Sequence, residues 1–440
     1  MRLFASSWQG WDMQSNRRRV CLAELGRIVT GKTPPSSLEG SFGGRVPFIT
    51  PSDYDGSKFI FRTARCLTSI GENAVRSARI PAGAVMVTCI GSDMGKVALS
   101  EREAFTNQQI NSLIVEDGVT AEYVYYNLLM RKSELRAKAS GSAQPILNKS
   151  AFGAVEIELP SIEEQGAIVS ILRSLDSRIN ILRQTNATLE SIAQALFKSW
   201  FIDFDPVRAK AEGREPEGMD ADTAALFPDS FEDSALGRVP HGWNVRSLDS
   251  IANYLNGLAM QKYPPESDDE YLPVIKIAQL RAGNAAGADK ASVNLKPEYI
   301  VRDGDVLFSW SGSLEVEFWC GGNGALNQHL FKVTSKEVPR WLYYLVTRHF
   351  LPGFREVAAH KATTMGHIQR KHLTEARLAL PSANLIAKSG EVIGPLLDRR
   401  IANSLQIREL AAIRDTLLPR LISGKLRLLE AEAQLNEALA

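Results

Sequence analysis

The sequence predicts an α+β protein made of two strand-rich modules joined by two long antiparallel helices that form a coiled coil. Three observations lead to this prediction. The chain repeats itself at a distance of about 220 residues. Each copy contains short apolar runs broken by Gly, Pro, Ser and Asn, a pattern typical of short strands. Each copy also ends in a heptad pattern long enough for an extended helix.

The repeat extends over most of the chain. Gly83 and Gly304 lie in similar apolar segments 221 positions apart, and each segment continues into a small polar turn. The other paired anchors are Asn107-Gln108 with Asn327-Gln328, Leu159-Pro160-Ser161 with Leu380-Pro381-Ser382 and, at a spacing of 226, Gly31 with Gly257. The difference in spacing reflects a shorter loop in the second copy, a change that costs little free energy. A repeat of this kind predicts that both modules share one fold.

Changes in pattern divide the chain into segments. The predicted segments are a leader (1–19), a first module (20–160), a central helix (161–204), an acidic linker (205–238), a second module (239–381), a C-terminal helix (382–428) and a tail (429–440). Strand-like runs are expected at 46–50, 84–90, 112–115 and 155–159, and again at 272–277, 306–310, 329–333 and 376–380. Helical stretches are expected at 122–139 and near 339–350.

Composition is that of an ordinary globular protein, with 44 % hydrophobic and 23 % charged residues. The net charge of +1 hides a segregation, because the linker is strongly acidic and both modules outside it are net basic. No apolar run is long enough to cross a membrane and no signal peptide is recognisable, so we expect a cytoplasmic protein. The four cysteines are widely spread and are expected to be reduced.

The two helical segments carry apolar seams that alternate in steps of three and four. The seam residues are Ile168, Leu172, Leu175, Ile179, Leu182, Asn186, Leu189 and Leu196 in the first helix, and Leu397, Ile401, Leu410, Ile413 and Leu417 in the second. The simplest arrangement pairs the helices with each other, antiparallel. Asn186 either fixes the register or lies at a wet position, and Gly394-Pro395 predicts that the second helix starts late or restarts there. A helix from Glu163 to Phe201 would span roughly 55 Å, more than one turn of DNA at about 34 Å.

One motif suggests nucleotide binding. The segment from Gly26 to Thr33 matches the P-loop pattern G-x-x-x-x-G-K-[ST]. A phosphate cradle needs a helix that opens at the Lys-Thr, but Pro34-Pro35 follows, and the matching Gly257 keeps neither the lysine nor the threonine. Nuclease, base-methyltransferase and metal-ligand patterns were not found, and we expect no metal and no cofactor. A P-loop ATPase and a helical protein-interaction scaffold remain as alternatives.

Loops at matching places in the two modules are rich in groups that suit DNA. Lys, Ser, Thr and backbone N–H groups suit phosphates, while Gln, Asn, His and Arg can read base edges. The candidates are Lys32, Thr33, Ser52, Ser92, Lys96, Ser142 and Gln144 in the first module, and Lys276, Trp310, Ser311, Ser313, Lys361, Thr363, Thr364 and His367 in the second. Asn107-Gln108-Gln109 could bind adenine, but its recurrence in the second copy favours a structural turn.

With these features the chain resembles the specificity subunit of type I restriction-modification enzymes from about Val20 to Leu428. The resemblance is carried by the duplicated module, by Leu159-Pro160-Ser161 leading into Glu163-Glu164-Gln165, by the segment from Leu196 to Phe204, and by Gly237 to Trp243. It implies two target-recognition domains that each read half of a bipartite double-stranded DNA site. It also implies paired helices that set the spacing and dock two adenine methyltransferase subunits. A non-catalytic binding subunit follows, with restriction–translocase subunits as further partners in defence against foreign DNA.

Overall fold

The computed structural model describes residues 17–91, 94–139, 145–360 and 366–439. The chain divides into two compact units. One contains the described residues up to 177 together with 411–439, and the other contains residues 178–410. Each unit therefore holds one of the two repeated modules and part of both long helices. The units are described separately below.

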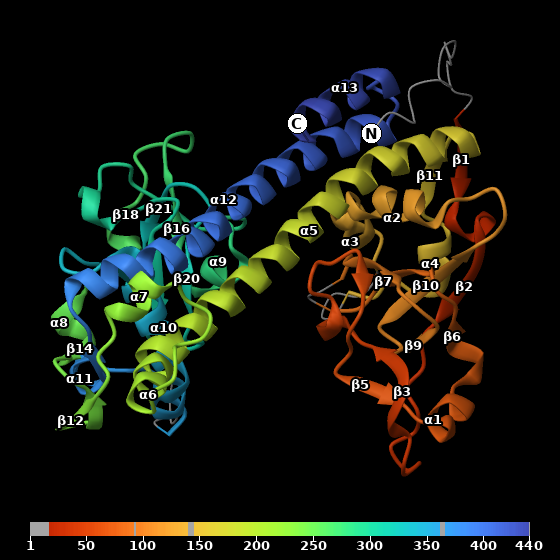
Figure 1. Cartoon of the computed structure of the whole chain (residues 1–440). Coiled ribbons are helices and arrows are strands. Elements are labelled where there is room, and N and C mark those ends of the chain that lie inside the picture. Colours follow the sequence, from red (N-terminus) through yellow and green to blue (C-terminus); the bar gives the residue numbers. More distant parts are fainter. Residues whose placement is uncertain (1–16, 92–93, 140–144, 361–365, 440) are drawn as a thin grey trace. The chain divides into compact units, whose positions relative to one another are not determined.

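The first module consists of two main sheets and one separate strand pair (Figure 1). Its strands are β1 (Arg18–Cys21), β2 (Gly26–Thr30), β3 (Phe42–Ile49), β4 (Phe59–Ile60), β5 (Arg65–Leu67), β6 (Arg79–Ile80), β7 (Val85–Thr88), β8 (Val97–Ser100), β9 (Ala104–Thr106), β10 (Ile110–Val115) and β11 (Glu156–Leu159). The larger sheet has the order β2-β10-β7-β8-β4 and the smaller one the order β5-β3-β9-β6, while β1 pairs with β11. Both β7 and β8 are buried along their whole length, which explains why each is apolar except for its last residue, Thr88 or Ser100.

Four helices belong to the first module: α1 (Ser69–Ala74), α2 (Ala121–Leu129), α3 (Lys132–Ala137) and α4 (Lys149–Gly153). The single helical stretch expected at 122–139 is therefore wrong, because α2 and α3 are separate. The break is at Arg131, whose backbone leaves the helical region at φ −100° and ψ 19°. Its guanidinium instead donates a hydrogen bond to the Glu156 carbonyl oxygen at 3.1 Å.

The second module repeats the strand order of the first. Its strands are β14 (Asn244–Ser247), β15 (Asn253–Asn256), β16 (Leu272–Ile275), β17 (Lys290–Ala291), β18 (Ile300–Val301), β19 (Val306–Ser309), β20 (Val316–Phe318), β21 (Gly324–Leu326), β22 (Leu330–Thr334) and β23 (Arg377–Leu380). The sheets are β15-β22-β19-β20 and β17-β16-β21-β18, and β14 pairs with β23. Even the one parallel pair of the smaller sheet, β3 with β9, recurs as β16 with β21. Only β4 has no counterpart among the described strands.

Helices of the second module are α8 (Leu248–Ile251), α9 (Ile277–Ala282), α10 (Arg340–His360) and α11 (Arg370–Glu375). The helix expected near 339–350 begins at Arg340 and continues about ten residues beyond the expected end, through Pro352 to His360. Five single 3-10 turns are also found in the described parts of the two modules, at Leu22–Glu24, Pro51–Asp53, Arg76–Ala78, Met260–Lys262 and Pro297–Tyr299.

Each unit has its own apolar core. In the first module Phe48, Met86 and Phe105 are fully buried between the two sheets. In the second unit the core reaches from Phe308 in the sheet to Phe197 and Trp200 at the end of the central helix. Full burial of one such side chain stabilises the fold by about 1.5–3 kcal/mol. The C-terminal end of the central helix is therefore part of the second unit's hydrophobic core.

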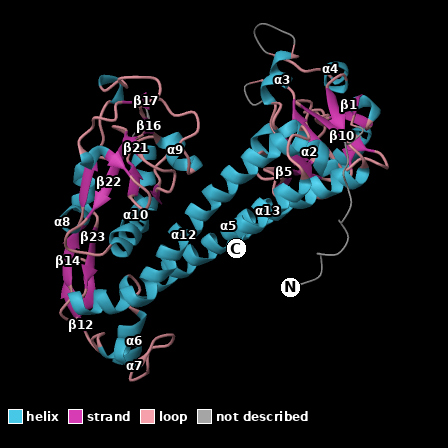
Figure 2. Ribbon diagram, turned by 90° about the horizontal axis from the view of Figure 1, so that it is seen from above, coloured by secondary structure: helices cyan, strands magenta, loops and turns pink. Residues whose placement is uncertain are grey.

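The two long helices are α5 (Ile162–Phe201) and α12 (Ala383–Ile422), and they run side by side (Figure 1 and Figure 2). In the first unit Arg414 binds Asp176 at 3.1 Å. In the second unit the Asn186 side chain donates to Ser404 Oγ at 3.1 Å and accepts from Asn403 Nδ2 at 2.9 Å. Partner numbers rise on one helix as they fall on the other, so the pair is antiparallel.

The seam residues lie at or near the contact between the two helices. Those that are buried are Ile168, Leu172, Leu175, Ile179, Leu182, Leu397, Ile401, Leu410 and Leu417. Those that are half-buried are Asn186, Leu189, Leu196 and Ile413. Because Asn186 has two hydrogen-bond partners on α12, its polar side chain is satisfied at this position.

The late start or restart expected for the second helix at Gly394-Pro395 is wrong. α12 is continuous from Ala383, and Pro395 lies inside it. Proline removes one backbone hydrogen bond, to the residue four positions earlier, Glu391. Glu391 and Pro395 are both on the exposed face, so water can satisfy the freed carbonyl oxygen.

The acidic segment between the modules is folded. It contains α6 (Asp205–Ala211), α7 (Ala221–Ala225) and the hairpin of β12 (Phe231–Ser234) with β13 (Gly237–Pro240). Val207 and Phe227 are fully buried in the core of the second unit. Asp220 caps α7 by accepting a hydrogen bond from Thr223 N at 2.9 Å. The acidic composition of this segment did not predict that one of its carboxylates caps a helix. At the other end of the chain, the expected tail is helical, as α13 (Leu428–Leu439).

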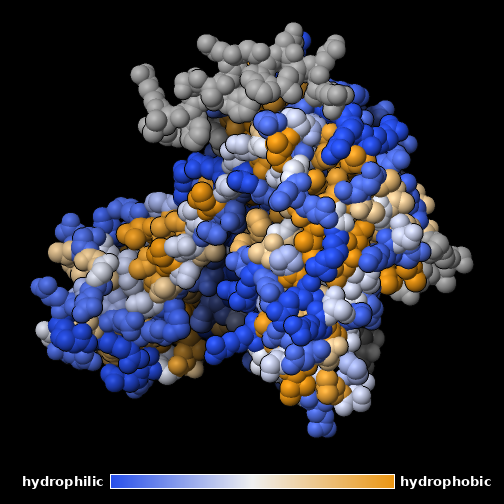
Figure 3. Space-filling view, turned by 90° about the vertical axis from the view of Figure 1, so that its right-hand side faces the viewer, coloured by the Kyte–Doolittle hydropathy of each residue, from blue (hydrophilic) through white to orange (hydrophobic). Residues whose placement is uncertain are grey.

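Hydrophobic residues on the surface are scattered. In the space-filling view they are interspersed with hydrophilic ones instead of forming one continuous band (Figure 3). Within the described part of the chain, no helix combines the length and apolar character needed to span a bilayer.

Candidate functional site

In each module, a glycine that follows a strand lies against the backbone of another loop. Gly31 follows β2, and Gly257 follows β15. A Cβ atom on Gly31 would lie 2.1 Å from the Asn107 carbonyl oxygen, and one on Gly257 would lie 2.3 Å from the Asn327 carbonyl oxygen. Neither glycine has a positive φ. Glycine is therefore needed here for close approach between two backbones and not for a special turn angle.

The loop that the glycine touches is shaped by an asparagine in both modules. Asn107 Oδ1 accepts a hydrogen bond from Gln109 N at 3.1 Å, and Asn327 Oδ1 accepts one from His329 N at 3.2 Å. Both asparagines are buried. Their side chains hold the turn, so the recurring Asn-Gln pair is structural at its first residue.

A third loop, which follows β7 in the first module and β19 in the second, contacts the asparagine turn. Cys89 N donates to the Gln109 carbonyl oxygen, and Trp310 N donates to that of His329. Leu147 N donates to the Cys89 carbonyl oxygen at 2.9 Å, and Ile368 N donates to that of Trp310 at the same distance. Antiparallel bridges follow in both modules, pairing Ile90 with Ile146, and Ser311 with His367. These segments form what we call the loop edge: residues 31–33, 88–91, 107–110 and 145–147 in the first module, and 257–259, 309–312, 327–330 and 366–368 in the second.

The P-loop-like segment lies on the loop edge of the first module. Lys32 Nζ is 3.0 Å from Ser77 Oγ, and the Thr33 hydroxyl donates to Gln108 Oε1 at 2.7 Å. Residues 31–41, all of them described, contain no helix. A phosphate cradle depends on the N–H groups and the positive dipole end of a helix N-terminus. The segment therefore lacks the geometry of a nucleotide site. Elsewhere in the described ranges, no cluster of His, Cys, Asp and Glu suited to a metal ion is found.

Comparison with known proteins decides the family. The family model described as type I restriction modification DNA specificity domain matches twice, at residues 15–191 and 240–407, and so covers both copies of the repeat. The chain belongs to this family of type I specificity subunits. In type I systems the catalytic activities lie in the partners of the specificity subunit.

Individual relatives agree with this assignment. The chain is 28 % identical over 435 residues to the type I restriction enzyme MjaIX specificity subunit of Methanocaldococcus jannaschii, covering 96 % of this chain and 94 % of that protein. It is 24 % identical over 357 residues to the HindI specificity subunit of Haemophilus influenzae, covering 70 % and 78 %. The crystal structure of a type I system S subunit from M. genitalium has the same fold, with a TM-score of 0.55 at 16 % identity over 94 % of this chain and 97 % of that one.

In the first module of the specificity subunit, most described candidates for DNA contact are at the loop edge or directly beside it. Lys32 and Thr33 are on it. Lys96 is held next to it, since its backbone N donates to Thr88 Oγ1 at 2.9 Å. Ser52 follows β3, the strand whose Ile49 carbonyl oxygen accepts from Asn107 N at 3.0 Å. The candidates Ser92, Ser142 and Gln144 lie outside the described residues.

In the second module the candidates gather around Trp310. Its Nε1 donates to Asn256 Oδ1 at 2.9 Å, and its ring centroid lies 5.9 Å from that of His329 and 6.3 Å from that of His367. Ser311 Oγ is 3.0 Å from His329 Nδ1. Ser313, two residues after Ser311, is exposed. Lys276 follows β16 and makes an ion pair with Asp289. The candidates Lys361, Thr363 and Thr364 lie outside the described residues.

Sequence reasoning missed two members of this cluster, Asn256 and His329. His329 was not among the predicted contact residues, although it directly follows the recurring Asn-Gln pair. The repeat itself contained the signal, because aligning the two copies places His329 on Gln109 at one position of the loop edge.

Each module is fixed to the long helices by a tyrosine that meets a carboxylate of α5. In the first unit the Tyr126 hydroxyl donates to Asp176 at 2.5 Å, and Arg414 of α12 binds the other oxygen of that carboxylate. Lys58 adds an ion pair to Glu122 at 2.5 Å. Burial, together with the charge of Asp176, raises the pKa of Tyr126 far above its ordinary range, so the hydroxyl remains a donor at neutral pH.

The second unit has a larger network of the same kind. The Tyr344 hydroxyl lies 3.0 and 3.1 Å from the two oxygens of Glu190. Arg348 and Arg400 bind Glu190 at 3.0 and 3.1 Å, and both also bind Glu317 of β20. Burial raises the pKa of Tyr344 as well. A charge this deeply buried is tolerated only when it is paired, so the network fixes how α10 lies on α5 and α12.

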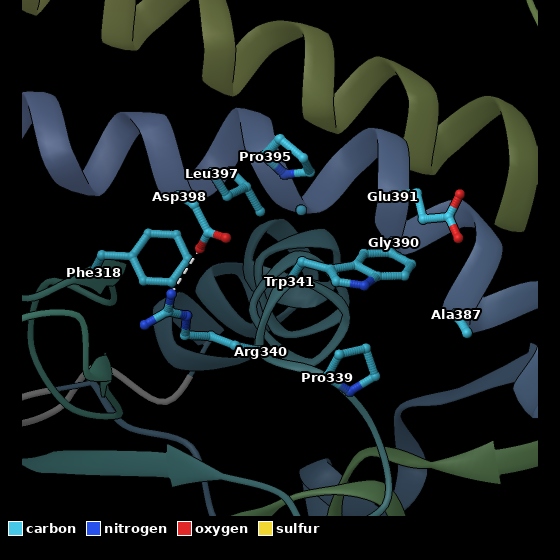
Figure 4. Close-up of a pocket in the computed structure, with 11 residues that line it drawn as sticks. Phe318, Pro339, Arg340, Trp341, Ala387, Gly390, Glu391, Pro395, Leu397 and Asp398 are labelled. Carbon is cyan, nitrogen blue, oxygen red and sulfur yellow. Dashed lines mark hydrogen bonds and ion pairs between the residues drawn. The ribbon is translucent and has the colours of Figure 1, made fainter.

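Beside this network is a surface pocket of about 480 Å³ (Figure 4). It opens between α12 and the start of α10, where Gly390 and Gly394 leave space over the Trp341 indole. Arg340 binds Asp398 at its rim at 2.7 Å. The small residues Ala387, Gly390 and Gly394 of α12 thus line the pocket opposite Trp341.

Proposed function

We propose that this specificity subunit reads a bipartite double-stranded DNA target, one half with each module, and directs adenine methylation and restriction by its partner subunits. The observation that carries the proposal is the loop edge, which recurs in both modules with the same backbone hydrogen bonds but different side chains. A reader of two different half-sites needs such an arrangement, because the frame stays constant while the contacting groups change.

The chemistry of the loop edge suits DNA. Lys32 and Lys96 supply positive charge for phosphates, and Gln108, Gln328 and His329 supply donors and acceptors of the kind that read base edges. Trp310 and the neighbouring imidazoles add flat surfaces. Ser311 Oγ does lie 3.0 Å from His329 Nδ1, but Ser311 is only 4 % exposed and its counterpart in the first module is Ile90, so the pair is not a feature common to both loop edges.

We propose that two adenine methyltransferase subunits dock on the paired helices α5 and α12, and that restriction–translocase subunits join the complex. The α5 surface of the second unit supports a protein partner. Between Gln184 and Ala195 its exposed residues are uncharged: Gln184, Thr185, Ala187, Thr188, Ser191, Ile192 and Ala195. Depletion of charge marks the core of protein interfaces.

The direct test is a map of methylated adenines. The chain would be co-expressed with its cognate methyltransferase subunit in a host that lacks other modification systems, and the DNA sequenced for modified bases. We expect a split motif whose two halves are separated by a fixed unread spacer. A contiguous motif, or no methylation by a complex that demonstrably assembles, would refute the proposal.

Salt dependence separates DNA reading from a purely structural role. A DNA reader releases counterions from phosphates, so its affinity falls linearly with salt on a logarithmic scale. We expect a steep slope for the assembled complex. A helical scaffold without a DNA role would give no measurable binding at any salt concentration.

A further inference from the structure

The loop edges of the two modules superimpose position by position in their hydrogen bonding. Gly31 N donates to the Ile110 carbonyl oxygen at 3.0 Å, and Gly257 N donates to that of Leu330 at 3.0 Å. The turn closes by Ile110 N to the Asn107 carbonyl oxygen at 3.1 Å in one module, and by Leu330 N to that of Asn327 at 3.0 Å in the other. Side chains at matched positions can therefore be compared directly.

Several matched positions are the same in both modules and serve the frame. The glycines are required by close approach, and the asparagines use their amides within the turn. Gln108 and Gln328 are also identical. Positions that do not vary can contribute affinity, but they give two modules no means to read different bases.

Other matched positions differ in chemistry. Lys32 and Thr33 match Leu258 and Ala259, and in the remaining segments the differing pairs include Cys89 with Trp310, Ile90 with Ser311, Gln109 with His329, and Ile146 with His367. Cys89 is buried, so its side chain cannot contact DNA. Antiparallel bridges place Ile90 beside Ile146 in the first module and Ser311 beside His367 in the second. In the second module His329 adjoins this pair, through its contact with Ser311.

The two sets present different surfaces. In the first module Ile146 is 41 % exposed, next to the half-buried Ile90, and this is an unusual place for two isoleucines. In the second module Ser311 and His367 occupy the same two positions, and Ser311 Oγ lies 3.0 Å from His329 Nδ1. Gln109, the first-module counterpart of His329, uses its Oε1 within the turn, where it accepts from Asn107 Nδ2 at 2.8 Å. The bridged pair is therefore apolar in the first module and polar in the second.

We propose that these positions determine the bases read: Ile90 and Ile146 contact a thymine methyl group in the first half-site, whereas His329 and His367, with Ser311 behind them, hydrogen-bond to a base edge in the second. The inference rests on the proposed function. The physical basis is that the thymine methyl group is the one apolar feature of the major groove, while polar side chains read donors and acceptors there.

The first test removes the methyl group from DNA. The assembled complex is titrated with duplexes carrying its mapped target, in which each thymine of the first half-site is replaced in turn by uracil. We expect one replacement to weaken binding about fourfold, the factor that corresponds to about 0.8 kcal/mol for one buried methyl group. The Ile146→Ala complex should bind the thymine and uracil duplexes equally. Full sensitivity in Ile146→Ala, or no sensitive thymine in the wild type, would overturn the inference.

Variant methylomes test the second module. We expect His329→Gln and His367→Ile to relax or change a base in the second half-site and to leave the first half-site intact. The unchanged half reports that the variant folds and assembles. Matched controls are His241→Gln, an exposed histidine paired with Glu232, and Ile70→Ala, an exposed isoleucine of α1. An unchanged second half-site in both histidine variants would overturn the inference.

Failure of this inference is distinct from failure of the proposed function. If the wild type yields no bipartite motif, the proposed function itself fails. If the wild type yields one and the variants keep it unaltered, the two modules read their half-sites through other residues.

Discussion

The Tyr344 hydroxyl of α10 donates to the Glu190 carboxylate of α5, and the two residues are 154 positions apart in the chain. Glu190 is 8 % exposed and is shared with Arg348 and Arg400. Tyr126 and Asp176 stand in the same relationship in the first unit. In both units the carboxylate comes from α5 and an arginine comes from α12, so each module is fixed to both helices by one acidic side chain, which is half-buried in the first unit and buried in the second.

Removal of this acid should destabilise the second unit strongly. We expect Glu190→Ala to lower the free energy of unfolding by about 3 kcal/mol, because two arginines lose a buried partner. All described tryptophans lie in this unit, so urea unfolding followed by tryptophan fluorescence reports on it. Asp268→Asn is the control: its carboxylate is 96 % exposed and its pair with Lys290 should contribute under about 1 kcal/mol. Equal losses of unfolding free energy in the two variants would contradict the structural role given to Glu190.

Close approach at the loop edge predicts that alanine is not tolerated at Gly257. The added Cβ would lie 2.3 Å from the Asn327 carbonyl oxygen and force the turn away. We expect Gly257→Ala to abolish reading of the second half-site, measured as methylation of targets altered in that half. Gly353→Ala in α10 is the control, since nothing lies within 4 Å of its Cβ and helix propensity favours alanine by up to about 1 kcal/mol. A normal methylome for Gly257→Ala would show that the turn can move.

Lys32 distinguishes DNA contact from nucleotide binding. We expect Lys32→Ala to weaken binding to all DNA sequences alike and to reduce the salt slope by about one, the signature of one lost phosphate contact. Titration with ATP should show no binding before or after the substitution. Specific ATP binding that disappears in Lys32→Ala would revive the P-loop hypothesis.

The two glycines of the pocket should respond differently to alanine. A Cβ on Gly390 would lie 2.8 Å from Trp341 Nε1 and displace the indole, whereas one on Gly394 would make an ordinary contact at 3.9 Å. We therefore expect Gly394→Ala to stabilise the second unit by up to about 1 kcal/mol through helix propensity. Gly390→Ala should give no such stabilisation, because the clash with Trp341 offsets the gain in helix propensity. The displaced indole should also shift the tryptophan emission. Thermal unfolding and fluorescence of both variants check this, and identical behaviour would mean that Trp341 moves freely.

Much of the architecture could be predicted from the sequence because it depends on periodicity. The repeat, the short strands and the two antiparallel helices follow from patterns that recur at fixed spacing. Pro395 was misread because its consequence depends on which face of the helix it occupies, and that is decided by packing. The folded acidic segment was missed for a similar reason, since Val207 and Phe227 find their core only in three dimensions.

The candidate site was predictable as a set of loops but not as an arrangement. That Lys32, Trp310 and His367 belong to matched loops could be inferred from the repeat. That Thr33 meets Gln108, or that Ser311 lies beside His329, depends on loop closure between strands far apart in sequence. The repeat identified Gly31 and Gly257 as matched positions, but the need for glycine there, which is backbone approach to Asn107 and Asn327, appears only in the structure.

The central claim is that each module reads one half of the target independently. The most direct test replaces residues 31–160 with the corresponding module of another family member and maps methylated adenines in the co-expressed complex. We expect one half of the motif to change to that of the donor protein while the other half stays intact. A motif altered in both halves would contradict the claim.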